Sequence, residues 1–117
     1  MIKLNKNTLD AELVQGDTGT FSFSIVDANT GKTFVNPGDE VWFTLKKIID
    51  QSVIIQKKIT EFPNDIVTIP LPPSETKELE AGNYIYDLKL IRSDGNVDTL
   101  NPNRPHSNFT VKKGVDS

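Results

Sequence analysis

Apolar and polar side chains alternate along most of the chain, which is the two-residue period of a β-strand with one buried face. The clearest example is the segment 19–26, where serines separate Phe21, Phe23 and Ile25. The same alternation predicts about seven strands, in residues 8–14, 19–26, 40–47, 53–59, 65–71, 83–91 and 107–113. Their inward-facing residues are expected to form the core: Leu9, Ala11, Leu13, Phe21, Phe23, Ile25, Val41, Phe43, Leu45, Val53, Ile55, Ile59, Val67, Ile69, Leu71, Tyr84, Tyr86, Leu88, Leu90, Phe109 and Val111.

Short polar segments with glycine and proline separate these strands, as in Pro37-Gly38 and Asp94-Gly95. Only the stretch around Ser74 favours a helix, a single turn that this serine could cap. The first four residues could add an edge strand. Many short strands with such turns predict an all-β sandwich or barrel. We expect one domain over residues 1–113, with 114–117 as a tail or the start of a linker.

The segment before the sixth strand suggests which all-β fold this is. A polar turn is followed by Leu79, Gly82 and then Tyr84 at the start of a strand. Immunoglobulin-like domains have a tyrosine at this corner, whose hydroxyl bonds back to the backbone a few residues upstream. Tyr86 stands where an antibody domain has a cysteine. The sequence therefore predicts an immunoglobulin-like antiparallel β-sandwich without the disulfide, with Tyr84 in a structural role.

Charge and composition exclude several functions. The 117 residues hold 13 Lys and Arg against 16 Asp and Glu, a formal net charge of −3. Proteins that grip phosphate backbones need a basic excess, so we expect no nucleic-acid partner. The chain has no cysteine, which excludes disulfides and thiolate metal sites. We find neither a secretory signal nor an apolar membrane span, which favours synthesis in the cytoplasm and no membrane partner.

No set of residues in the sequence has the spacing of an active site. His106 is the single histidine, and neither a nucleophile nor an orienting acid can be assigned to it. Asp94, Asn96 and Asp98 have the spacing of calcium ligands, but a hairpin turn explains them without a metal. The glycines of segment 16–19 lead into a strand, whereas a phosphate loop opens a helix. We therefore expect no enzyme and no cofactor.

Trp42 is the most informative side chain for binding. It alternates with the core residues of its strand and so faces the other side of the sheet. In an immunoglobulin-like sheet, Ile85 and Ile91 lie on that same outer face. Together the three residues could form an apolar partner-contact patch, since exposed aromatic-rich patches often mark interfaces. The alternative is that a loop or the N-terminal segment covers Trp42.

Several segments together resemble the N-terminal domain of phage baseplate upper proteins. These segments are GDTGTFSFSIVDANTGK (16–32), EVWFTLKK (40–47), LEAGNYIYDLKLIRSDGNVDTL (79–100) and FTVKK (109–113). The resemblance covers residues 9–113 and includes no catalytic motif. It implies a β-sandwich that fixes a receptor-binding protein to the phage tail tip, with a ring-forming distal tail protein as partner. It also implies a virion location after assembly in the bacterial host cytoplasm, and a homo-oligomer in a full-length protein.

A second interpretation stays open. The chain could be an immunoglobulin-like module of a bacterial surface protein that binds carbohydrate, with Trp42 stacked on a sugar, or that only spaces other domains. Binding to glycans would favour this interpretation, and neighbouring tail genes would favour the first.

Overall fold

The computed structural model describes residues 2–5, 7–27, 29–102 and 106–114. These residues form mostly β-structure, with one turn of α-helix and one 3-10 turn. The elements are β1 (Lys3–Leu4), β2 (Ala11–Val14), β3 (Phe21–Ser24), β4 (Glu40–Lys47), β5 (Val53–Ile59), η1 (Pro63–Asp65), β6 (Ile66–Ile69), α1 (Pro73–Thr76), β7 (Gly82–Ile91), β8 (Val97–Thr99) and β9 (Ser107–Lys112).

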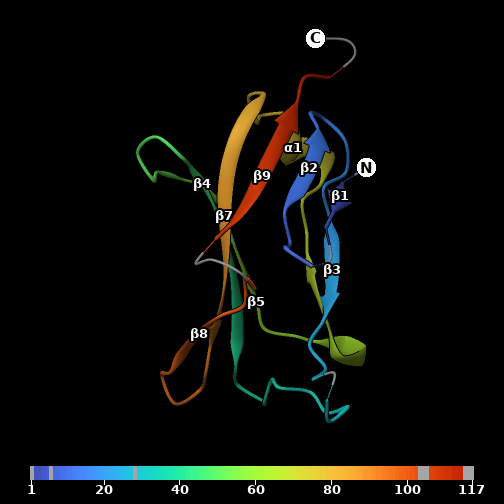
Figure 1. Cartoon of the computed structure of the whole chain (residues 1–117), viewed down its shortest axis with the longest axis vertical. Helices are drawn as coiled ribbons and strands as arrows, with labels where there is room; N and C mark the ends of the chain where they lie inside the picture. The colour runs from blue at the N-terminus through green and yellow to red at the C-terminus, as the bar shows by residue number, and fades with distance from the viewer. Residues whose placement is uncertain (1, 6, 28, 103–105, 115–117) are drawn as a thin grey trace.

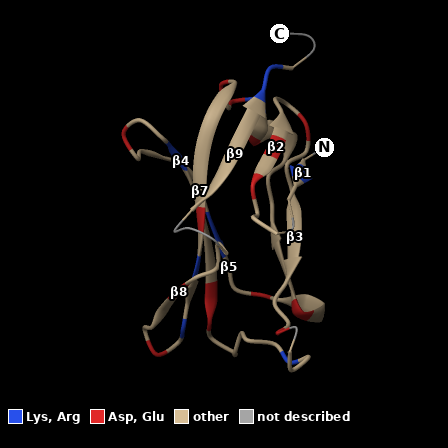
Figure 2. Ribbon diagram, in the orientation of Figure 1, with Lys and Arg blue, Asp and Glu red and all other residues tan. Residues whose placement is uncertain are grey.

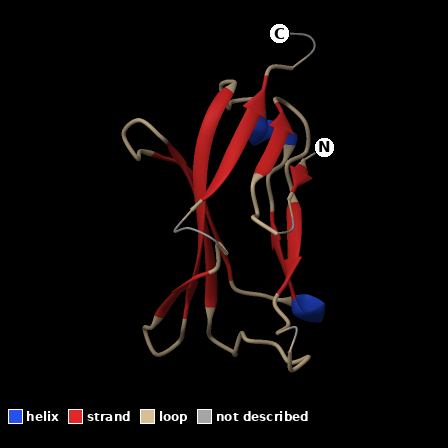
Figure 3. Ribbon diagram, in the orientation of Figure 1, coloured by secondary structure: helices blue, strands red, loops and turns tan. Residues whose placement is uncertain are grey.

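The strands form a large sheet of seven and a small sheet of two (Figure 1). The large sheet has the order β1-β2-β9-β7-β4-β5, and β8 pairs with part of β7. The small sheet consists of β3 and β6. Figure 3 shows β3 across from the long strands of the large sheet, with few helical residues anywhere. The prediction of an all-β chain is confirmed at this level.

The large sheet is mixed, so the expectation of a wholly antiparallel arrangement is wrong. β2 pairs in parallel with β9, with Ala11 opposite Phe109 and Leu13 opposite Val111. Parallel neighbours need a long connection between them. Here the second strand and the last strand meet, so almost the whole chain serves as that connection. The other pairs of the large sheet are antiparallel.

Aromatic rings fill the space between the two sheets. The ring of Phe21 on β3 lies 5.9 Å from Phe43 on β4 and 6.0 Å from Tyr86 on β7, centroid to centroid. Tyr86 also packs 5.3 Å from Phe43 and 6.0 Å from Phe109 on β9. Edge-on contacts of this kind add to the free energy gained by burial alone. The inward residues predicted by alternation are those that pack here, with one exception.

That exception is Val53, which is 55% exposed and lies outside the core. Between β4 and β5 the register shifts by one residue, because Leu45 pairs with Ile55 whereas Lys46 pairs with Val53. A bulge of this kind turns the side chain beyond it, here that of Val53, to the other face of the sheet. A pattern of alternating residues cannot reveal it, since Val53, Ile54 and Ile55 are all apolar.

Other local features differ in detail from the expectations. β1 confirms the N-terminal edge strand, and β8 is a further short strand that the alternation missed because Val97 is its single apolar residue. The helical turn is present, but Pro72 is its N-cap and no side chain caps it. Ser74 lies inside the turn. Of the expected tail, Gly114 is described and residues 115–117 lie outside the described residues.

Two tyrosines fix the start of β7, one to the turn just before it and one to a segment near the N-terminus. The Tyr84 hydroxyl donates to the Glu80 carbonyl at 2.6 Å, the contact expected of the corner tyrosine. The buried Tyr86 hydroxyl donates to the carbonyl of Leu9, just before β2. Burial raises the pKa of both phenols, so neither loses its proton near neutral pH.

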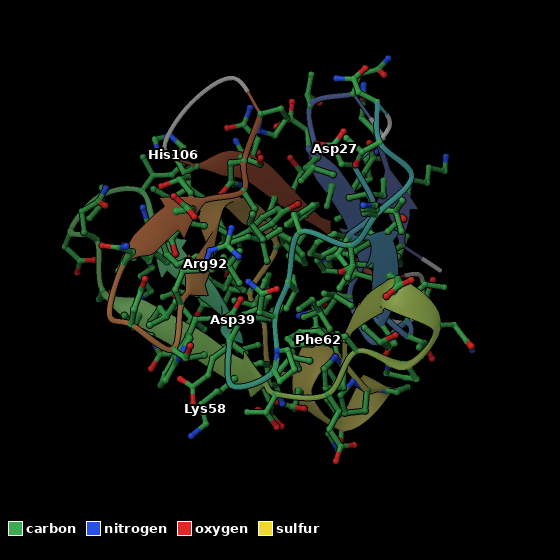
Figure 4. All side chains as sticks on the ribbon, turned by 90° about the horizontal axis from the view of Figure 1, so that it is seen from below. Asp27, Asp39, Lys58, Phe62, Arg92 and His106 are labelled. Carbon is green, nitrogen blue, oxygen red and sulfur yellow. The ribbon has the colours of Figure 1, made fainter. Side chains whose placement is uncertain are left out.

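Asp39 ties the loop before β4 to the turn after β7. Its side chain is buried and accepts from the Asn36 amide at 2.8 Å, the Ser93 amide at 3.0 Å and Arg92 Nη1 at 3.2 Å. Figure 4 shows Asp39 and Arg92 side by side at this end of the molecule. The hydrogen bond from Asn36, aided by those of Ser93 and Arg92, outweighs burial and lowers the pKa of Asp39.

This network predicts a defined acid sensitivity. Because the folded-state pKa of Asp39 lies below the unfolded value of about 4, the carboxylate stabilises the fold above that pH. The contribution is lost as pH falls through the folded pKa. We expect Asp39→Asn to lower the free energy of unfolding by about 2–3 kcal/mol at pH 7. Its unfolding midpoint in urea should also fall less between pH 5 and pH 2.

The matched control is Asp98→Asn. Asp98 also contacts Arg92, at 3.3 Å from Nε, but its side chain is 56% exposed. An exposed ion pair contributes about 0–1 kcal/mol. If both variants unfolded at the urea concentration of the wild type, the account of Asp39 would be wrong.

Candidate interaction surface

The three residues expected to form an apolar patch lie on one face of the large sheet but do not form a continuous patch. Ile85 is only 6% exposed, whereas Trp42 and Ile91 are partly buried. Across the β4–β7 ladder, Trp42 faces Lys89 and Ile85 faces Lys46. Charged side chains therefore stand between the apolar residues. The expectation that Ile85 contributes exposed surface is wrong.

Trp42 is itself covered in part by its neighbours. Its indole Nε1 donates to Glu40 at 3.0 Å, and Lys58 Nζ lies 5.7 Å from the ring centroid. Lys58 also approaches Glu40 at 3.9 Å. An ammonium over an indole ring is a favourable arrangement. Trp42 is thus partly covered, and strand neighbours supply at least part of this cover.

Exposed large aliphatic side chains instead gather at the turn between β4 and β5. We call residues 47–53 the hairpin tip. Ile49 is 95% exposed, Ile48 49% and Val53 55%. The hairpin projects away from the rest of the molecule (green in Figure 1). Single exposed aliphatic residues are common, whereas two isoleucines and a valine at one projecting tip form an exposed aliphatic cluster.

The backbone of the hairpin tip is held by its own hydrogen bonds. The Lys47 amide donates to the Ser52 carbonyl at 3.0 Å, and the Gln51 amide to the Lys47 carbonyl at 3.1 Å. Asp50 accepts from the Ser52 amide at 2.9 Å, and this bond lowers the pKa of its carboxyl group. The isoleucines are therefore presented on a defined turn, which reduces the entropy lost when a partner binds.

A shallow hollow of about 490 Å³ adjoins the hairpin tip. One wall is formed by Lys47, Ile48, Ile49 and Asp50, and the other by residues 80–84 at the corner of Tyr84. The hollow has both apolar and polar atoms on its walls. Alternation of apolar and polar residues does not predict this surface, because Ile48 and Ile49 are adjacent. Two adjacent isoleucines followed by an acidic turn residue are the feature of the sequence that could have indicated it.

The opposite end of the molecule has a larger, polar hollow of about 650 Å³. It is lined by Arg92 and by Asp94, Asn96 and Asp98, the residues with calcium-ligand spacing. The Asp94 carboxylate accepts from the amide of Asn96 at 2.9 Å, and Asp98 pairs with Arg92. These bonds are those of a hairpin turn, as expected. Among the residues that the structure describes, no three potential ligands gather as a metal site.

His106, labelled in Figure 4, lines a small hollow on the face of the large sheet that does not include the acidic residues of that polar hollow. Its neighbours there include Lys46, Asp87 and Lys89. Lys46 and Asp87 form an ion pair at 3.1 Å. Figure 2 shows positive and negative residues mixed over the described part of this sheet.

Comparisons with known proteins place no further constraint on the chain. No family model matches it, no curated protein matches it, and no solved structure matches it. Within the described part of the chain, no helix has the length and apolar character needed to cross a bilayer.

Two isoleucines, Ile85 on β7 and Ile49 in the hairpin tip, separate structural from surface roles. Ile85 is buried, so Ile85→Ala should lower the free energy of unfolding by about 2–4 kcal/mol. Ile49 is almost fully exposed, so Ile49→Ala should change it by less than about 0.5 kcal/mol. Chemical unfolding of both variants measures the difference. Equal losses would mean that the tip packs against the body of the protein.

Proposed function

We propose that this chain is a structural adaptor domain of a phage or prophage tail baseplate, which docks a receptor-binding protein to the tail tip. Its location is then the virion tail, after assembly in the cytoplasm of the bacterial host. The sequence resemblance over residues 9–113 suggests this assignment. The observation that carries a docking role is the exposed aliphatic hairpin tip.

The chemistry of the surface supports docking rather than catalysis. Several charged residues on the strands are paired with neighbours, such as Lys57 with Glu75 at 2.7 Å and Lys112 with Glu12 at 2.7 Å. The hairpin tip instead offers aliphatic side chains on a fixed turn. Partner interfaces commonly centre on a few such anchors, which supply most of the binding energy.

We further propose that the fold is immunoglobulin-like. In that fold the third, sixth and seventh strands are neighbours in one sheet, and the second and fifth pair in the other. The neighbours β9-β7-β4 and the pair β3-β6 support this reading, as does the corner tyrosine Tyr84. β5 then extends the first sheet, and the small sheet keeps two strands.

A module that binds carbohydrate is the second candidate, and one observation favours it. The polar hollow at the end of the molecule offers carboxylate, amide and guanidinium groups within one concave surface. The stacking role expected of Trp42 is disfavoured, because Lys58 lies over its ring. Specific binding of the isolated chain on a glycan array would support this candidate.

The adaptor proposal predicts that the chain binds a particular class of tail protein. Co-expression with each tail protein encoded beside its gene should yield a complex with a ring-forming distal tail protein. Ile49→Asp should weaken that complex at least about tenfold, because it places a charge in an apolar contact. Isothermal titration calorimetry measures the change in dissociation constant.

The matched control is Val97→Asp, on β8. Val97 is 57% exposed but lies away from the hairpin tip. We expect this variant to bind within about twofold of the wild type, since surface changes outside an interface are nearly neutral. Failure to bind any tail-tip subunit would refute the adaptor function. Equal weakening by both variants would refute the hairpin tip as its docking site.

A further inference from the structure

β3 has one side with no neighbouring strand. Within the described residues it pairs only with β6, and the ladder is bounded by bonds from the Gly19 amide to Leu71 at 2.8 Å and from the Ile25 amide to Asp65 at 3.0 Å. In an antiparallel ladder every second residue bonds to the partner strand. Phe21 and Phe23 therefore bond to β6.

The backbone N–H and C=O groups of the intervening residues point the other way. These residues are Thr20, Ser22 and Ser24, and all three are exposed. The position of Pro70 agrees with this direction. In this register Pro70 lies across from Thr20, where the backbone of β6 also points away from β3, and proline has no N–H that would be left unpaired there. β3 thus presents, at the edge of the small sheet, a row of backbone donors and acceptors that no other described strand pairs with.

Other strand edges carry features that discourage pairing with another chain. β5 has Lys57 and Lys58, the edge of β6 has Pro70, and β1 is two residues long with Lys3. Lysine, proline and short length are the usual protections of an edge. β3 is four residues long, but it has neither lysine nor proline, since from Gly19 to Val26 the chain holds no charged residue and no proline. Figure 2 shows β3 without any charge.

We propose that β3 is a self-association site, which pairs antiparallel with β3 of a second copy of this chain. Ser22 then lies on the two-fold axis opposite Ser22 of the second copy, and Thr20 lies opposite Ser24. These outward residues of each copy exchange N–H···O bonds with the other copy. The two small sheets become one four-stranded sheet in the order β6-β3-β3-β6.

The side chains suit pairing with an identical strand. On the outer face, hydroxyl groups meet hydroxyl groups, a pairing already present inside the sheet between Ser22 and Thr68 at 2.8 Å. On the inner face, Phe21 meets Phe23, which is only partly buried in the single chain. A charged partner strand would find no counter-charge here, whereas a second copy brings the same uncharged residues. This favours a second copy as the occupant.

The first test introduces a charge at the axis. Sedimentation velocity over a concentration series should show a monomer–dimer equilibrium for the wild type. Ser22→Lys should raise its dissociation constant at least about tenfold, because like charges directly opposite each other repel. Thr68→Lys is the matched control. It places the same charge on the same face of the small sheet, but on β6, one strand away from the β3 edge. It should change the constant by less than about threefold.

A second variant keeps the test independent of charge. Ser22→Pro removes an N–H that the β3–β6 ladder does not use, and edge positions of this kind tolerate proline. It should therefore fold, with a cooperative thermal transition, and be monomeric. A wild type that stays monomeric at every concentration would overturn the proposal, as would a dimer that neither variant weakens.

A cross-link tests the register. The chain has no cysteine, so Ser22→Cys introduces the single thiol. Directly opposed residues of a hydrogen-bonded pair have Cα atoms about 5.5 Å apart, within the disulfide range of about 4.4–6.8 Å. Mild oxidation should give a covalent dimer for Ser22→Cys and none for Thr68→Cys. Equal cross-linking of both would contradict this register.

The proposal does not depend on the adaptor function. The hairpin tip and β3 lie on opposite sides of the molecule in Figure 1. Ile49→Asp should leave the dissociation constant of the dimer unchanged. The dimer and the complex with a tail protein are measured separately, so one proposal can fail while the other holds.

Discussion

The fold depends on the packing around Tyr86. Its ring contacts one aromatic ring from each of three strands, Phe21, Phe43 and Phe109, and its hydroxyl group bonds to Leu9. These contacts join β7 to both sheets and to the segment before β2. Under the proposed immunoglobulin-like fold, Tyr86 takes the position at which domains with a disulfide join their two sheets by a covalent bond. Here a buried tyrosine with a satisfied hydroxyl group joins them without any thiol.

A buried polar cluster supports the same region. β9 pairs with the first half of β7 and β8 pairs with its last three residues. The backbone groups between these two stretches, on the same side of β7, bond to neither strand. The buried Asn101 side chain accepts from the Leu88 amide at 2.8 Å and donates to the Ser107 hydroxyl at 2.9 Å. Ser107 in turn donates to the Thr8 carbonyl at 2.9 Å. Unpaired polar groups are costly in an interior, so this cluster allows β7 to change partners along its length.

The sequence predicted the strands well because each long strand has one apolar face. Residues 40–47 and 53–59 are observed as β4 and β5 with the same bounds, and the position of Tyr84 indicated its hydrogen bond. Alternation says which side of a strand is buried, but not which strands are neighbours. The parallel pairing of β2 with β9 and the bulge at Val53 therefore could not be foreseen.

The exposure of the predicted apolar patch was misjudged for a related reason. Alternation assigns Trp42 and Ile85 to the outer face, but their exposure depends on long charged neighbours such as Lys58 that cover them. Such cover is a tertiary property, since lysine stems lie along apolar surface and keep only their charge in water. The isoleucines of the hairpin tip have no neighbouring strand to supply this cover, because the turn carries them beyond the sheet.

The two proposed surfaces have a joint consequence. If two copies pair through β3, the hairpin tips lie on the far sides of the dimer, since each tip is opposite β3 in its own chain. Both tips then cannot reach one small site on a partner. They can engage two equivalent sites on a repeating partner such as a ring, where the second contact forms at high effective concentration. Modest contacts at each tip would then suffice for stable assembly, which suits a surface with few aliphatic anchors.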